Sequence, residues 1–235
     1  MRIDKYPYIE GVCDKCNNKI ITILSIVTSR WETKGEGIIK TLLEDKVFYG
    51  MGSYWAIHNE DTEEGYNCCE AFNKATEESK TDIIVYSTGD ILIEPQLLWR
   101  AYGLLLLHDF PVFAYRMDEQ GDGSWRENDD ALGDFIMIKK EWGSEIGGWN
   151  CLMTNWGFMD HEFLVRIGLL LSKESVCLGF EKRDRVKHFY HSRKEDTWYK
   201  EQNKINRKIF LDNPLWNKES YEDWKRKILV GQAYL

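Results

Sequence analysis

Residues 155–166, NWGFMDHEFLVR, place two carboxylates on either side of a histidine, directly before a stretch with the apolar spacing of a helix. A structural reading is that Asn155 or Asp160 caps this helix, with the acidic side chains in its first turn, where the helix dipole favours negative charge. A catalytic reading is that Asp160 accepts a proton from a substrate hydroxyl, because the backbone fixes a carboxylate at a helix start. This stretch alone leaves both readings open.

A second candidate site follows the apolar run DIIVY at residues 82–86. The next four residues are STGD, and Asp90 is the first carboxylate after the run. Aspartate is common in turns, so Asp90 could be a simple turn residue. It could also hold a divalent cation against a diphosphate, because hard cations take carboxylate and phosphate oxygens together.

Strands that alternate with helices must position these residues. Residues 20–28 form a β-branched run that predicts a strand, and a polar turn at 29–37 and a helix from residue 38 follow it. Further strands are expected near residues 46–49 and 82–86, with a helix at 64–80 between them. This alternation predicts an α/β fold with a mixed, mainly parallel sheet and a ligand site at the carboxyl ends of its strands.

The composition is that of a globular protein with one sizeable core. The chain has 235 residues, of which 43% are hydrophobic and 14% aromatic. A net charge of −8 argues against a broad nucleic-acid surface, although residues 182–187 contain a local basic patch for an anion. The N-terminus lacks a signal-peptide-like apolar run and residues 104–107 are too short to span a bilayer, so we expect a cytoplasmic protein. Cys13 and Cys16 form one C-x-x-C without a second pair, which favours reduced thiols over a metal site.

The segment AFNKATEESKTDIIVYSTGDILIEPQLL resembles nucleotide-sugar glycosyltransferases of the GT-A fold, in which an A-R-N-x-G helix leads to a strand and an Asp-x-Asp turn. Asn73 matches the asparagine and Asp90 the second aspartate, whereas Phe72 replaces the arginine and Thr88 the first aspartate. The resemblance implies that the donor is bound here and after the first strand. The implied donor-binding residues are Thr28, Ser29, Arg30, Asn73, Thr88, Gly89 and Asp90.

The second half is similar to the same enzymes. ALGDFIMIKKEWGSEIGGWN resembles their glycine-rich segment beside the donor sugar, and NWGFMDHEFLVR resembles W-G-x-E-D-x-E-(F/L)-x-x-R, with Met159 in place of a glutamate. These motifs occur in the inverting family 2 and in the galactosyltransferase C-terminal-domain type of family 7. The resemblance implies Asp160 and Glu162 as catalytic residues, although Glu162 and Arg166 are four apart and could simply pair. The implied sugar and acceptor residues are Gly148, Trp149, Trp156 and Gly157.

The stretch KHFYHSR at residues 187–193 resembles the segment in which these families carry a metal-binding histidine beside the diphosphate. The resemblance implies that His191, with His188 as the second choice, joins Asp90 on Mn²⁺ or Mg²⁺. Residues 118–130, which are rich in acids, are expected to form a mobile acceptor loop.

The sequence therefore predicts a single GT-A domain over residues 1–235, with a nucleotide-sugar half at about 20–130, an acceptor half at about 131–192 and a helical tail at 193–235. The implied reaction is inverting transfer from a nucleotide-diphosphate sugar, expected to be a UDP-sugar, to an acceptor hydroxyl. One alternative is a non-catalytic relative that binds sugar or nucleotide, since Thr88 and Met159 replace acidic family residues. Another keeps the chemistry but transfers to a hydroxymethylated base in viral DNA, against which the acidic net charge counts. A glycan or a small molecule is the other expected acceptor.

Overall fold

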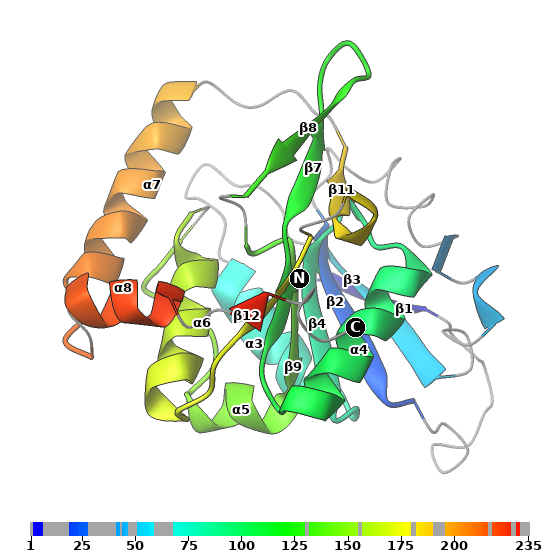
Figure 1. Cartoon of the computed structure of the whole chain (residues 1–235), viewed down its shortest axis with the longest axis horizontal. Coiled ribbons are helices and arrows are strands. Elements are labelled where there is room, and N and C mark those ends of the chain that lie inside the picture. The colour runs from blue at the N-terminus through cyan, green and yellow to red at the C-terminus, as the bar shows by residue number, and fades with distance from the viewer. Residues whose placement is uncertain are drawn as a thin grey trace.

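A mixed sheet forms the centre of the molecule (Figure 1). The computed structural model describes residues 2–6, 19–27, 41–42, 44–46, 51–58, 68–129, 132–154, 157–179, 182–189, 196–215, 218–226 and 229–230. In their order across the sheet, the strands are β1 (Arg2–Tyr6), β3 (Gly52–His58), β2 (Ile21–Val27), β4 (Ile83–Thr88), β9 (Phe135–Lys139), β6 (Val112–Ala114), β10 (Val176–Leu178) and β12 (Leu229–Val230).

Parallel pairing dominates where the alternation of strands and helices predicts it. β2 pairs in parallel with β3 and with β4, and β6 pairs in parallel with β10. β9 runs antiparallel between β4 and β6 and so joins the two halves of the sheet. The predicted mixed, mainly parallel sheet flanked by helices is confirmed.

Two details of the sheet differ from the sequence prediction. Of the strand expected near residues 46–49 only Lys46 lies within the described ranges, where it is helical, and the strand that the structure shows, β3, begins at Gly52. The longer aromatic and β-branched run in β3 is buried between β1 and β2, and this burial favours it as the strand. β1 was not predicted, because its five residues, RIDKY, are mostly charged and include only one aliphatic side chain.

A second, smaller sheet carries the polar residues that are discussed below. Across it lie β5 (Ile91–Leu92), β11 (Val186–His188), β7 (Arg116–Glu119) and β8 (Trp125–Asn128). β7 and β8 form an antiparallel hairpin that projects from the molecule in Figure 1. The described part of the expected acceptor loop at 118–130 is therefore a paired hairpin, closed by a bond from the Gln120 N–H to the Ser124 carbonyl at 2.7 Å.

The helices pack around the sheet. They are α3 (Cys68–Glu78), α4 (Pro95–His108), α5 (Lys140–Glu145), α6 (Met159–Leu170), the 3₁₀ helix η2 (Lys182–Asp184), α7 (Asp196–Leu211) and α8 (Lys218–Arg226). The helices expected at 64–80 and after the acidic motif are thus present as α3 and α6. None of the helices in the described ranges is both long and apolar enough to cross a membrane.

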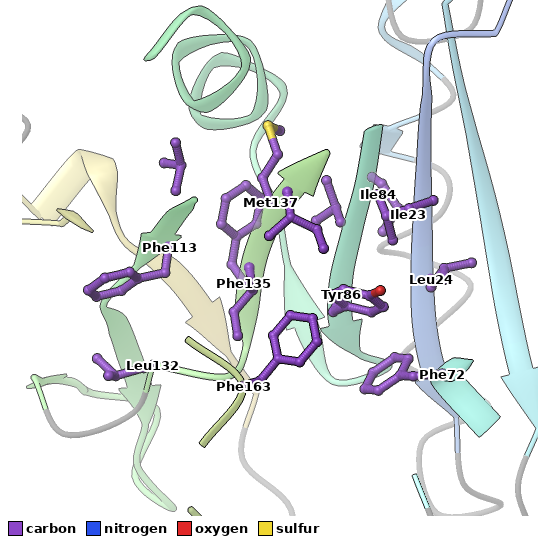
Figure 2. Close-up of a cluster of buried hydrophobic side chains, with 14 of the residues drawn as sticks. Ile23, Leu24, Phe72, Ile84, Tyr86, Phe113, Leu132, Phe135, Met137 and Phe163 are labelled. Carbon is purple, nitrogen blue, oxygen red and sulfur yellow. The ribbon is translucent and has the colours of Figure 1, made fainter. Parts of the chain in front are cut away.

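Aromatic side chains fill the core between β4 and the helices. Tyr86 on β4 lies among Phe72 of α3 and Phe163 of α6, as Figure 2 shows. The Trp149 ring stacks on Phe163 with centroids 4.2 Å apart and is only 4% exposed. The core therefore fixes α3 and α6 against the strand that leads to Asp90.

Candidate functional site

Asp90 lies in a tight turn directly after β4. The turn is tied to the neighbouring strand by the Gly89 N–H, which donates to the Ile26 carbonyl at 2.7 Å. The Thr88 hydroxyl donates to Asp90 Oδ1 at 2.6 Å, and Asp90 is only 2% exposed. Asp90 is buried because β11 covers the turn: the Phe189 N–H donates to the Asp90 carbonyl at 3.0 Å.

The pairing of the smaller sheet brings His188 between two aspartates. β11 lies between β5 and β7, with His188 in register with Ile91 on one side and with Asp118 on the other. His188 Nε2 is 2.9 Å from Asp90 Oδ2, and His188 Nδ1 is 3.0 Å from Asp118 Oδ1. Burial alone would lower the pKa of His188, but hydrogen bonds to Asp118 and Asp90 outweigh it and raise that pKa to about 9.

Arg116 continues this row toward the second half of the chain. Its Nε lies 2.7 Å from Asp118 Oδ1, and its Nη1 lies 2.5 Å from Asp134 Oδ2. Burial would raise the pKa of Asp118, but His188 and Arg116 hold it well below its usual range. The row runs Asp90, His188, Asp118, Arg116, Asp134, so three buried carboxylates alternate with two cationic side chains.

The far end of this row leads to Asp160. Asp134 follows Gly133, and a Cβ built on Gly133 would lie 2.7 Å from the Asp160 Cβ, so the two chain segments touch. Asp160 is the second residue of α6, its side chain is 18% exposed, and its Oδ1 is 3.3 Å from His161 Nδ1. Burial pushes the pKa of Asp160 up, but the charge and hydrogen bonds of His161 more than offset this, so the pKa is lowered.

The capping reading of this motif fails. The N-cap of α6 is Phe158, which has a left-handed backbone with φ of 61° and no side-chain cap bond. Asp160 lies within the first turn, where its charge still favours the helix dipole. The side chain of Asp160 is therefore not required to cap the helix.

The glycine-rich turn at residues 147–149 is fastened by two helices. On one side the Asn73 amide exchanges two bonds with the Trp149 backbone: its Nδ2 donates to the Trp149 carbonyl at 2.9 Å, and the Trp149 N–H donates to its Oδ1 at 2.7 Å. On the other side Arg166 donates to the Ile146 and Gly148 carbonyls at 2.5 and 2.6 Å. Gly148 has φ of 77°, and a Cβ there would lie 2.4 Å from Asn73 Oδ1, so the position requires glycine.

Glu162 anchors Arg166 from within α6. Both Glu162 oxygens accept bonds from Arg166, each at 2.9 Å, and Glu162 is 1% exposed. The pairing expected from their spacing is confirmed. With both oxygens engaged, Glu162 orients Arg166 toward the turn.

Other predicted site residues have different outcomes. Trp149 belongs to the core rather than to a surface on which a sugar could rest, because its ring packs against Phe163 and Tyr86. Gly157 has φ of 100° and abuts Asn203 of α7, with which a Cβ would clash at 2.5 Å.

The basic patch predicted at residues 182–187 is compensated by acids: Lys187 pairs with Glu94 at 2.9 Å, and Arg185 with Asp129 at 2.6 Å. The following predicted residues lie outside the described ranges: Thr28, Ser29, Arg30, Trp156, His191, Cys13 and Cys16.

The sequence prediction missed Arg116, Asp118 and Asp134. Arg116 and Asp118 are two apart on a strand and so share one face, a period-2 signal that was hidden in the segment taken for a loop. Asp134 stands directly before β9, in the turn that contacts Asp160. These residues connect the two candidate sites.

The Asp90 carboxylate suits a divalent cation, and His188 Nε2 lies 2.9 Å from it. Only a neutral imidazole binds a metal, so His188, which is protonated between Asp90 and Asp118, must first lose its Nε2 proton. No group of three His, Cys, Asp or Glu side chains suited to a metal occurs in the described ranges. These two residues would therefore need further ligands from the diphosphate, from water or from His191, whose distance to Asp90 stays a prediction.

A mixed sheet with an aspartate turn after a central parallel strand is the arrangement of GT-A glycosyltransferases, and the chain has this fold. Among solved structures it is similar to the catalytic domain of Drosophila β1,4-galactosyltransferase 7 in complex with xylobiose, with TM-score 0.55 and 15% identity over 84% of this chain and 83% of that one. A mutant of that enzyme with manganese, UDP-Gal and xylobiose gives TM-score 0.55 and 15% identity over 78% and 79% of the two chains. GalNAc-T7 with UDP, GalNAc and Mn²⁺ gives TM-score 0.51 and 13% identity over 92% of this chain and 56% of that one. No family model and no curated protein sequence matches the chain.

Proposed function

We propose that the protein is a glycosyltransferase that moves a sugar from a UDP-sugar to an acceptor hydroxyl, with inversion and with Asp160 as the base. The observation that carries the proposal is the continuous row of contacts from Asp90 through His188 and Arg116 to Asp134, next to Asp160. The solved structures of the same fold, which are named as galactosyl- and N-acetylgalactosaminyltransferases with UDP and manganese, support it.

Asp160 has the properties of a base. Its lowered pKa keeps it ionised at neutral pH, and its side chain is part-exposed, with 18% of its surface open to solvent. In an inverting transfer the acceptor oxygen attacks the anomeric carbon as its proton passes to the carboxylate, and the bond to the diphosphate breaks. The other carboxylate of the motif, Glu162, is occupied by Arg166, so we assign it a positioning role.

The donor end is formed by Asp90 with His188 or His191. When bound there, Mn²⁺ or Mg²⁺ would neutralise charge on the departing diphosphate. Thr88 replaces the first aspartate of the family turn, but its hydroxyl fixes the orientation of Asp90. Asn73 acts indirectly by holding the backbone of the 147–149 turn at the position where relatives approach the donor sugar.

The test separates this function from a non-catalytic binding relative. The full chain is incubated with UDP-glucose, UDP-galactose and their N-acetyl forms, with manganese or with a chelator, and free UDP is measured. Slow hydrolysis of one donor that requires metal supports the enzyme. Binding of UDP-sugars without turnover under every condition supports the non-catalytic relative. Transfer to hydroxymethylated duplex DNA is a separate arm, which the net charge of −8 predicts to be negative.

A further inference from the structure

Beyond the proposed donor and base, a pocket beside the acceptor motif carries three cationic side chains. Its volume is about 420 Å³, and it lies between α7 and the residue that precedes α6. Its lining residues are Phe158, Lys200, Glu201, Asn203, Lys204 and Arg207. The volume is within the range of small-molecule sites.

The cations are grouped by the helix period. Lys200, Lys204 and Arg207 are four and three residues apart, which places them on one face of α7, and all three are exposed. Glu201 offsets part of this charge through a bond from Lys204 at 2.7 Å. The lining keeps a net positive charge in a chain whose net charge is −8, so the pocket is a locally positive site on an acidic protein.

A second feature of the pocket is an amide oxygen without a partner. Asn203 Oδ1 is buried, and within the described part of the chain it accepts no hydrogen bond. It lies against Gly157, in the motif that leads to Asp160. A buried acceptor of this kind is stabilised when a ligand supplies a hydroxyl or N–H donor.

The position of the pocket relates it to the acceptor rather than to the donor diphosphate. Phe158 is two residues before Asp160, and its ring lies 5.7 Å from Phe210 of α7, centroid to centroid. The donor end at His188 is on β11, and in Figure 1 α7 and β11 lie on opposite sides of β7. The pocket is thus reached from the Asp160 end of the row of contacts.

We propose that this pocket binds an acidic sugar residue of the acceptor, through a carboxylate or phosphate on Lys200, Lys204 and Arg207 and a hydroxyl on Asn203. The inference rests on the proposed glycosyltransferase function and names its acceptor class. Phe158 supplies an aromatic face of the kind on which sugar rings pack.

The test uses glucuronate, glucose 6-phosphate and neutral glucose as probes, with dissociation constants measured by NMR titration of the full chain. We expect one or both acids to bind about tenfold more tightly than glucose, which corresponds to two or more charge-assisted contacts at an exposed site. Comparison of the two acids distinguishes a carboxylate from a phosphate. The double variant Lys204→Gln with Arg207→Gln should bind the acids no better than glucose. Lys208→Gln is the matched control, because Lys208 is exposed on the same helix but does not line the pocket.

Equal binding of the acids and glucose would overturn the inference, as would an equal effect of Lys208→Gln, which would indicate general charge attraction. A loss of UDP affinity in the double variant would assign the cations to the donor instead. UDP-sugar hydrolysis, measured in parallel, keeps the two proposals apart. If the protein hydrolyses a UDP-sugar but binds the acidic sugars no better than glucose, only the acidic-sugar inference is refuted. If it prefers the acidic sugars but hydrolyses no UDP-sugar, only the proposed glycosyltransferase activity is refuted.

Discussion

Asp160→Asn and Glu162→Gln should have opposite effects on chemistry and stability, although the residues are two apart on one helix. Asp160 makes no cap bond, so its replacement removes only its interaction with the helix dipole and with His161. The dipole contribution is about 0.3–1 kcal/mol, so the free energy of unfolding should fall by about 1 kcal/mol or less. If Asp160 is the base, turnover should fall by roughly 10²–10⁴-fold with UDP affinity unchanged.

Glu162→Gln leaves the Arg166 guanidinium buried without a compensating charge. Loss of one partner from a buried ion pair lowers the free energy of unfolding by about 3–5 kcal/mol. Because glutamine keeps one acceptor oxygen for Arg166, we expect a decrease near the lower end of this range, about 3 kcal/mol. Turnover should fall less than in Asp160→Asn, because only the position of the turn changes.

The assay pairs urea denaturation with transfer kinetics on the same preparations. An Asp160→Asn protein with full turnover would refute the assignment of the base. A Glu162→Gln protein that is as stable as the wild type but inactive would instead make Glu162 the base and contradict its positioning role. Loss of stability in Asp160→Asn by 3 kcal/mol or so would show that Asp160 has a structural role of the size expected for a buried pair.

Three further predictions concern the turn, the metal end and pH. Gly148→Ala should lower the free energy of unfolding in urea by about 2 kcal/mol, because a side chain at φ of 77° costs about 1–2 kcal/mol and displaces Asn73; Gly103→Ala, with open space around its Cβ, is the control that should not. Asp90→Asn should weaken manganese-dependent UDP binding at least about tenfold by calorimetry while UDP binding in chelator stays the same; equal loss in both would exclude a metal role. The pKa of Asp160 is lowered from its ordinary value, so this carboxylate stays ionised between pH 7 and 5, and kcat/KM should show no loss from it in that range; an acid limb near pH 6 that Asp160→Asn abolishes would contradict this.

The sequence was most informative where local pattern and burial agree. The apolar runs of β2 and β4 and the periodicity of α3 and α6 predict elements that the structure contains, because each buries a continuous face. The family motifs located the turn at Asp90 and the helix start at Asp160. In both cases short-range spacing is enough to fix the element.

The rest depended on long-range pairing that no local pattern encodes. His188 meets Asp90 and Asp118 only because β11 inserts between β5 and β7. Tryptophan is a residue type on which sugar rings pack, so the sequence favoured a sugar-binding role for Trp149. The structure places it in the core instead, because its ring stacks on Phe163 of α6, which comes later in the chain. A glycine at position 148 indicates that another group lies close to the backbone there, but only the structure identifies this group as the Asn73 side chain.

The smaller sheet also has a consequence for the order in which the chain acquires its site. Asp90 is the first residue of the row to leave the ribosome, and His188 follows it 98 residues later. Contacts between such distant segments form late, since the intervening chain must first be ordered. A nascent or truncated chain that ends before β11 would therefore lack both the strand that covers Asp90 and the histidine that bonds to the two aspartates, so Asp90 and Asp118 would not be held together. Assembly of the proposed donor end is thereby coupled to synthesis of the chain through β11.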